Sequence, residues 1–63
     1  MTPEEFAEKM RRLAGEKDEY GQYWPEDPER AHGEMDDLLC EVLESLGYRE
    51  GVEIFRNTRL WYA

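Results

Sequence analysis

A histidine, an aspartate and a cysteine follow one another at four-residue intervals in the middle of this sequence, as His32, Asp36 and Cys40. Residues four apart lie one turn apart on a helix, so His32 and Asp36 could form a catalytic or metal-binding pair. Two residues are too few for a metal or catalytic site, and no further His or Cys is spaced to complete one. A structural role, as a hydrogen-bonded pair at the core boundary, is therefore favoured. Cys40 is two turns from His32, which favours a small interface residue over an activated nucleophile. We therefore predict no catalytic residue, no metal and no cofactor.

Four carboxylates recur at spacings of three, four and three, which places them along one side of a helix. Without a pocket that raises one pKa, the default interpretation is a solvated surface and not an acid–base pair. A sharper hypothesis is mimicry, in which the row of negative charge occupies a nucleic-acid-binding groove of another protein. The acidic stripe, a candidate partner-binding surface, consists of Glu34, Asp37, Glu41 and Glu44.

The helix that carries the acidic stripe is the best marked element of the sequence. Asp27 is a favourable N-cap, Pro28 suits the first helical position, and Gly47 can adopt the left-handed conformation that ends a helix. These signals predict a long helix over residues 28–46. Its other side is apolar, because apolar residues recur at the 3, 4, 7 spacing of one helix face. These residues are Ala31, Met35, Leu38, Leu39, Val42, Leu43 and Leu46.

The centre of this apolar arc is expected to be the buried part of the helix. Leu39 lies near the middle of the arc, whereas Cys40 lies well round toward the polar side. The sequence therefore predicts that Leu39 is buried and that Cys40 is not.

Two further helices are predicted. Thr2 can cap a helix over residues 3–14, with Pro3 in its first turn and Glu5 closing a capping box. Residues 52–55 could alternate as a short strand, but a lone strand would lack a pairing partner, so a helix over residues 49–61 is predicted. Trp61 and Tyr62 are expected at the end of this helix or in a dimer contact.

Residues 15–26 are predicted to form a loop, because they contain two glycines and a proline and have no sustained period. The loop carries three aromatic residues, which either complete the core or project as anchors for a partner. A core position is favoured for Trp24, while Tyr20 and Tyr23 are equally suited to both. All three are candidate partner-binding residues.

Composition limits the class of protein. Sixteen acidic and eight basic residues give a net charge of −8, which disfavours direct binding to nucleic acid or to anionic membranes. No apolar run approaches membrane-spanning length, and no signal peptide is evident, so a cytoplasmic location is expected. A chain of 63 residues with one cysteine cannot form an internal disulfide, and it has no set of Cys and His residues at zinc-ligand spacing. Self-association is therefore the remaining way to bury more apolar surface. The expected fold is an all-α, three-helix domain that forms homo-oligomers.

The C-terminal part of the chain resembles small acidic helical proteins encoded by phages and prophages of Gram-positive gut bacteria. The resemblance covers about residues 27–63 and consists of a His-x3-Asp-Leu-Leu segment, a Leu-Gly-Tyr segment and a final Trp-Tyr. The matching positions are His32, Asp36 or Asp37, Leu38, Leu39, Leu46, Gly47, Tyr48, Trp61 and Tyr62. These relatives are uncharacterised, so the resemblance implies a phage origin and transfers no activity.

Small phage proteins commonly bind and block a host protein, and by this analogy the leading hypothesis is a non-enzymatic inhibitor of a host factor. A defence nuclease complex is the expected target class, as for an anti-CRISPR or similar anti-defence protein in the cytoplasm of the host cell. The alternative is a self-assembling structural or regulatory phage accessory protein whose interface is the apolar arc. The sequence leaves open the partner, the stoichiometry and the binding of a small ligand or nucleotide.

Overall fold

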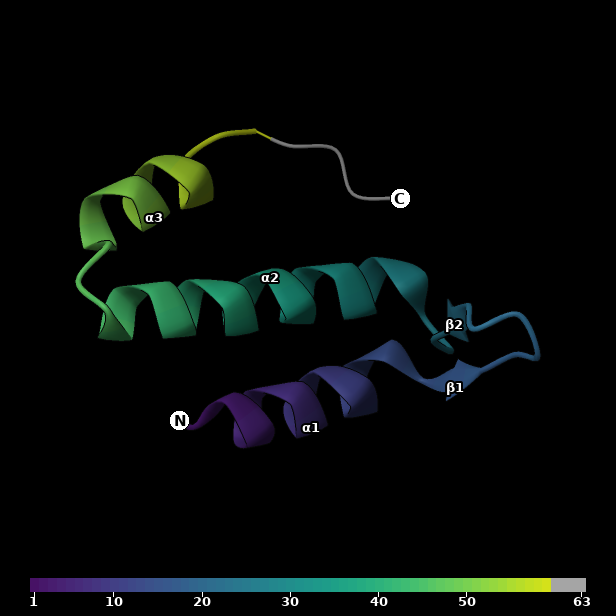
Figure 1. The fold of residues 1–63 in the computed structure, drawn as a ribbon. Helices are drawn as coiled ribbons and strands as arrows, with labels where there is room; N and C mark the ends of the chain where they lie inside the picture. The colour runs from purple at the N-terminus through teal and green to yellow at the C-terminus, as the bar shows by residue number, and fades with distance from the viewer. Residues whose placement is uncertain (60–63) are drawn as a thin grey trace.

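The computed structural model describes residues 1–59 and contains three helices and one short β-hairpin (Figure 1). Helix α1 spans Pro3–Ala14. It begins with the predicted capping box, in which the Thr2 hydroxyl accepts the Glu5 N–H at 3.1 Å and the Glu5 carboxylate accepts the Thr2 N–H at 2.8 Å. The backbone hydrogen bond from Thr2 lowers the pKa of Glu5. Gly15, with φ of +84°, ends the helix.

Helix α2 spans Pro28–Ser45, as its end signals predict. The Asp27 carboxylate accepts the Arg30 N–H at 3.2 Å and so caps the first turn. At the other end Gly47 has φ of +93°; the Gly47 N–H donates to the Glu44 carbonyl and the Tyr48 N–H to the Leu43 carbonyl, each at 3.0 Å. This is a Schellman motif, and it turns the chain directly into the next helix.

Helix α3 spans Arg49–Arg56, so the ambiguous residues 52–55 are helical. The prediction that this helix extends to residue 61 is wrong, because α3 ends at Arg56. The Asn57 amide donates to the Glu53 carbonyl at 2.9 Å and the Thr58 hydroxyl donates to the Ile54 carbonyl at 2.7 Å, so side chains bind carbonyls at the end of the helix. Trp61 and Tyr62 lie outside the described residues.

The segment predicted as a plain loop contains a β-hairpin, so the fold is mostly helical and not purely α. Strands β1 (Glu16–Lys17) and β2 (Tyr23–Trp24) pair antiparallel, with Glu16 opposite Trp24 and Lys17 opposite Tyr23. The Lys17 ammonium lies 5.6 Å from the centroid of the Tyr23 ring, within the range of a cation–π contact.

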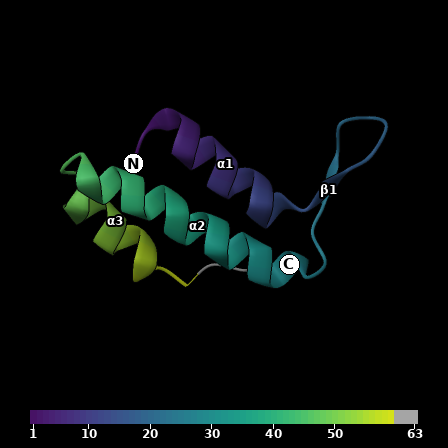
Figure 2. The ribbon, with the colours of Figure 1, turned by 90° about the horizontal axis from the view of Figure 1, so that it is seen from below.

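The three helices form one layer. Successive helices run in opposite directions, and in both views α2 lies between α1 and α3, while the hairpin projects beyond the helices (Figures 1 and 2). The principal extents of the molecule are 39, 29 and 15 Å, so the arrangement is flat. The buried apolar residues lie in or next to the two helix contacts: Ala14, Ala31, Leu38, Cys40 and Val52.

The flat layer reverses the expected burial of two neighbouring residues. Leu39, predicted to be buried, is 45% exposed, whereas Cys40, predicted on the polar side, is only 3% exposed. Leu38 packs on the α1 side of α2 and Cys40 on the α3 side, about 160° apart at 3.6 residues per turn. Leu39 lies between them and points out of the layer. The sequence identifies the centre of the apolar arc of α2, but α1 and α3 pack against the two edges of this arc.

Candidate protein-binding surfaces

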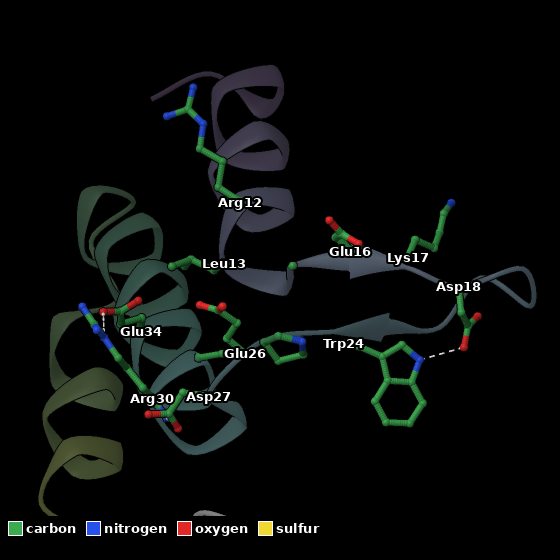
Figure 3. A pocket seen from close by; sticks show the side chains of 13 residues that line it. Arg12, Leu13, Glu16, Lys17, Asp18, Trp24, Glu26, Asp27, Arg30 and Glu34 are labelled. Atoms are coloured by element: carbon green, nitrogen blue, oxygen red, sulfur yellow. Dashed lines mark hydrogen bonds and ion pairs between the residues drawn. The ribbon is translucent and has the colours of Figure 1, made fainter.

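Asp18 organises the hairpin through both of its carboxylate oxygens. One oxygen accepts the backbone N–H groups of Tyr20 and Gln22, each at 2.9 Å, and the other accepts the Trp24 indole N–H at 2.7 Å (Figure 3). The Asp18 N–H donates to the Gln22 carbonyl at 2.8 Å, and Gly21 completes the turn with φ of +85°. The indole hydrogen bond, followed by the N–H of Gln22, lowers the pKa of Asp18, so this carboxylate is ionised at neutral pH.

The aromatic residues of the hairpin project into solvent instead of completing the core. Trp24 is 66% exposed and Tyr20 is 88% exposed, so the expectation that Trp24 belongs to the core is wrong. Tyr23 is also exposed, under the Lys17 ammonium. Because Asp18 fixes the indole, Trp24 presents a large apolar surface with part of its conformational freedom already removed.

Gly15 holds the base of the hairpin against the end of α1. A Cβ atom at this position would lie 2.7 Å from the Trp24 carbonyl oxygen and 2.8 Å from the Pro25 Cα, closer than side chains approach backbone. Gly15 combines this close approach with φ of +84° and ψ of −152°, a region that only glycine adopts readily. The position of Trp24 therefore depends on a residue nine positions earlier that carries no side chain.

A cavity of about 780 Å³ lies between the hairpin, the end of α1 and the start of α2 (Figure 3). Three basic side chains line it, those of Arg12, Lys17 and Arg30. Several carboxylates also line it, among them Asp18 and Glu34. Among the described residues, its lining includes no Ser, Thr, Cys, His or Tyr. Charges of both signs suit it to hydrogen bonds and ion pairs with a polar ligand or peptide.

The acidic stripe lies on one side of the layer, and two arginines neutralise part of it. Arg30 pairs with Glu34 at 3.0 Å, and Arg56 of α3 pairs with Asp37 at 3.0 Å and with Glu44 at 3.7 Å. Lys9 and Arg12 of α1 border the same side, in a groove that they share with Glu34, Asp37 and Glu41. Four carboxylates against two arginines leave a net charge of −2 on the stripe and its partners, less than the sequence pattern indicates.

His32, Asp36 and Cys40 are the candidate reactive residues of α2. The His32 Nε2 and Asp36 Oδ2 atoms are 3.6 Å apart, within ion-pair range but longer than a hydrogen bond. Cys40 is buried, 3% exposed, in the wall of a groove between α2 and α3. Among residues 1–59, no group of three His, Cys, Asp or Glu residues is arranged to hold a metal ion.

The part of the chain that the structure describes contains no helix long and apolar enough to span a membrane. Comparisons with protein-family models, with curated proteins and with solved structures give no match. The function must therefore be argued from the surfaces themselves.

Sequence reasoning identified the aromatic residues and the acidic stripe but missed Asp18 and Arg56. The signal for Asp18 is its position three residues before a glycine in a turn, where aspartate often binds backbone N–H groups. Arg56 had no comparable signal, because its two partners lie on another helix.

Proposed function

We propose that this protein is a non-enzymatic protein-binding module and that the hairpin is its main recognition element. The observation that carries the proposal is the Asp18–Trp24 hydrogen bond, which holds a 66% exposed indole in one orientation. Tryptophan and tyrosine are the residues most enriched at the energetic centres of interfaces, and an oriented anchor loses less entropy on binding. An indole held in place at the surface contributes little to packing within the chain.

The proposed biological role is inhibition of a host factor by a phage-encoded protein, with a defence nuclease complex as target class. This role rests on the resemblance of residues 27–63 to small phage proteins and on the net charge of −8. The acidic stripe would add electrostatic attraction to a basic surface of the target. Because Arg30 and Arg56 neutralise part of the stripe, we assign the larger share of the binding energy to the hairpin.

A self-assembling phage accessory protein is the second candidate. The observation that favours it is the row of exposed leucines on α2, where Leu46 is 66% exposed and Leu39 is 45% exposed. Such residues are suited to contact another protein surface.

Affinity capture from host extract with the tagged chain tests the hairpin. Trp24→Ala should weaken binding of the captured protein by at least about 30-fold, the effect of losing an interface hot spot. Asp18→Ala keeps the indole but releases it, and should weaken binding about tenfold. Ile54→Ala is the control, because Ile54 is a large apolar residue of similar exposure, 65% against 66%, that lies on α3 outside the hairpin. Equal capture by the wild type and the Trp24→Ala variant would contradict the proposal.

The contribution of the acidic stripe is tested by charge neutralisation at two sets of sites. Replacing the four carboxylates of the stripe with Gln or Asn changes the net charge from −8 to −4. Replacing Glu4, Glu8, Glu50 and Glu53, which are exposed on α1 and α3 outside the stripe, makes the same change in total charge. We expect the first variant to bind more weakly and the second to bind as the wild type does. Equal affinity of both variants would remove electrostatic mimicry from the proposal.

A further inference from the structure

Within the described residues 1–59, the layer of helices leaves one side of α2 uncovered. Leu38 packs against α1 and Cys40 packs against α3, so both lateral sides of α2 are occupied. The two remaining sides point out of the layer. One carries the acidic stripe, and the other carries the centre of the apolar arc; Asp37 and Leu39, two residues apart, lie about 160° from each other.

The uncovered apolar face continues from α2 onto α3. Leu39, Leu43 and Leu46 are 45%, 42% and 66% exposed. Beside them a groove of about 360 Å³ separates α2 from α3, and its lining is almost entirely apolar. The remaining wall residues of the groove are Asp36, Cys40, Tyr48, Gly51, Val52 and Phe55. We define the apolar face as Leu39, Leu43, Leu46 and this groove.

The surface area of the chain is larger than that of a compact protein of its size. The chain exposes 5550 Å². A compact monomeric protein of 7.6 kDa exposes about 4,300 Å². The exposed leucines of α2 and the projecting hairpin both contribute to this excess of about 1,200 Å². A standard interface buries about 800 Å² on each partner.

We propose that the apolar face binds the apolar face of a second copy of this chain in a two-fold symmetric homodimer. Face-to-face pairing gives two packed layers around one apolar core, the usual architecture of a stable domain. A single layer of helices lacks that core.

The distribution of charge favours a second copy as the occupant. The acidic stripe lies on the opposite side of each layer, so pairing through the apolar face places the two stripes on the outer surfaces. The ionisable groups of α2 at this face, His32 and Asp36, lie 3.6 Å from each other. Two chains with a net charge of −8 can therefore meet without bringing their densest negative surfaces together.

Gly51 in the groove provides a test that separates a partner contact from internal packing. Among residues 1–59, a Cβ atom at Gly51 would meet no atom within 4 Å, so the packing of these residues does not require glycine at this position of α3. In the dimer, an added methyl group would project into the groove that the second copy approaches. Gly33 is the matched control, since it also lies inside a helix with nothing within 4 Å of an added Cβ. It lines a different groove, on the side of α2 that carries Asp37.

Sedimentation velocity of the full chain, from low micromolar to several hundred micromolar, is the experiment. We expect a mass of twice 7.6 kDa at the upper concentrations. Gly51→Ala and Leu39→Gln should each raise the dissociation constant at least about tenfold, and Gly33→Ala should leave it within about twofold. Circular dichroism at the lowest concentration checks that each variant keeps its helices.

Three results would overturn the proposal. The first is a mass of 7.6 kDa at every concentration, and the second is assembly beyond a dimer, which a closed two-fold contact excludes. The third is an unchanged dissociation constant in both Gly51→Ala and Leu39→Gln. The outcome is independent of the hairpin, because Trp24→Ala should dimerise as the wild type does.

Discussion

Replacement of Gly15 by alanine should have a large effect, although the change adds only a methyl group at an exposed position. The φ of +84° and ψ of −152° cost a non-glycine residue about 1–3 kcal/mol. The new Cβ would also lie 2.7 Å from the Trp24 carbonyl oxygen and 2.8 Å from the Pro25 Cα, and relief of such overpacking costs about 1–3 kcal/mol more. The total, about 2–6 kcal/mol, is comparable with the free energy of unfolding of a 63-residue domain, about 3–9 kcal/mol.

Gly21→Ala is the control for this prediction. Gly21 has φ of +85° but open space around an added Cβ, so alanine there should cost only the conformational strain, about 1–2 kcal/mol. Both substitutions restrict the unfolded chain equally, so this contribution cancels in the comparison. The difference between the two variants therefore measures the close approach of the hairpin to Gly15.

Urea unfolding of the two variants, at one fixed protein concentration, is the assay. If Gly15→Ala only opens the hairpin and leaves the helices packed, the loss in free energy of unfolding is smaller than the total given above. In that case the Trp24 indole N–H resonance must move, because its bond to Asp18 at 2.7 Å breaks. Equal stability of the two variants together with an unchanged indole resonance would refute the reasoning.

Three further predictions concern single side chains. At concentrations where the chain is monomeric, Leu38→Ala should cost about 2–5 kcal/mol in urea unfolding, and Leu39→Ala less than half as much, because Leu38 is 7% and Leu39 45% exposed. The lowered pKa of Asp18 stabilises the hairpin above the ordinary aspartate pKa, and this contribution is lost as pH falls through the folded value; the Trp24 indole resonance should titrate with a midpoint below that ordinary value. Arg56→Ala removes two ion pairs between α3 and α2, and should cause a small loss in thermal stability that disappears at high salt.

The helix boundaries could be predicted where they depend on local chemistry. Thr2, Asp27 and Gly47 act within a few residues of their own positions, and each makes the interaction that its type and place indicate. The end of α3 was missed because Asn57 and Thr58 bind carbonyls of the last turn, and that competition is not visible in the apolar period. The hairpin was missed because strands of two residues are too short to show alternation.

The burial of Leu39 and Cys40 could not be predicted, for a different reason. Helical periodicity fixes which residues share a side of α2, but it does not fix where the neighbouring helices lie. The prediction assumed that they cover the centre of the apolar arc, whereas α1 and α3 flank it on opposite sides. The same reason applies to the hairpin. Tyr20, Tyr23 and Trp24 could be named as candidate binding residues from the sequence, but their exposure depends on tertiary structure.

The segregation of charge and apolar surface on opposite sides of one layer gives the two proposed interactions opposite responses to salt. At about 0.1 M ionic strength, charges are screened beyond about 10 Å. The layer is 15 Å in its shortest extent, so the acidic stripe acts on its own side of the molecule and only weakly on the other. Salt should therefore weaken attraction between the stripe and a basic target. It should favour pairing of two chains of net charge −8, because it screens their mutual repulsion while the apolar contact persists. If both interactions weakened with salt to the same extent, charge would contribute to both surfaces and the assignment of separate roles to the two sides would fail.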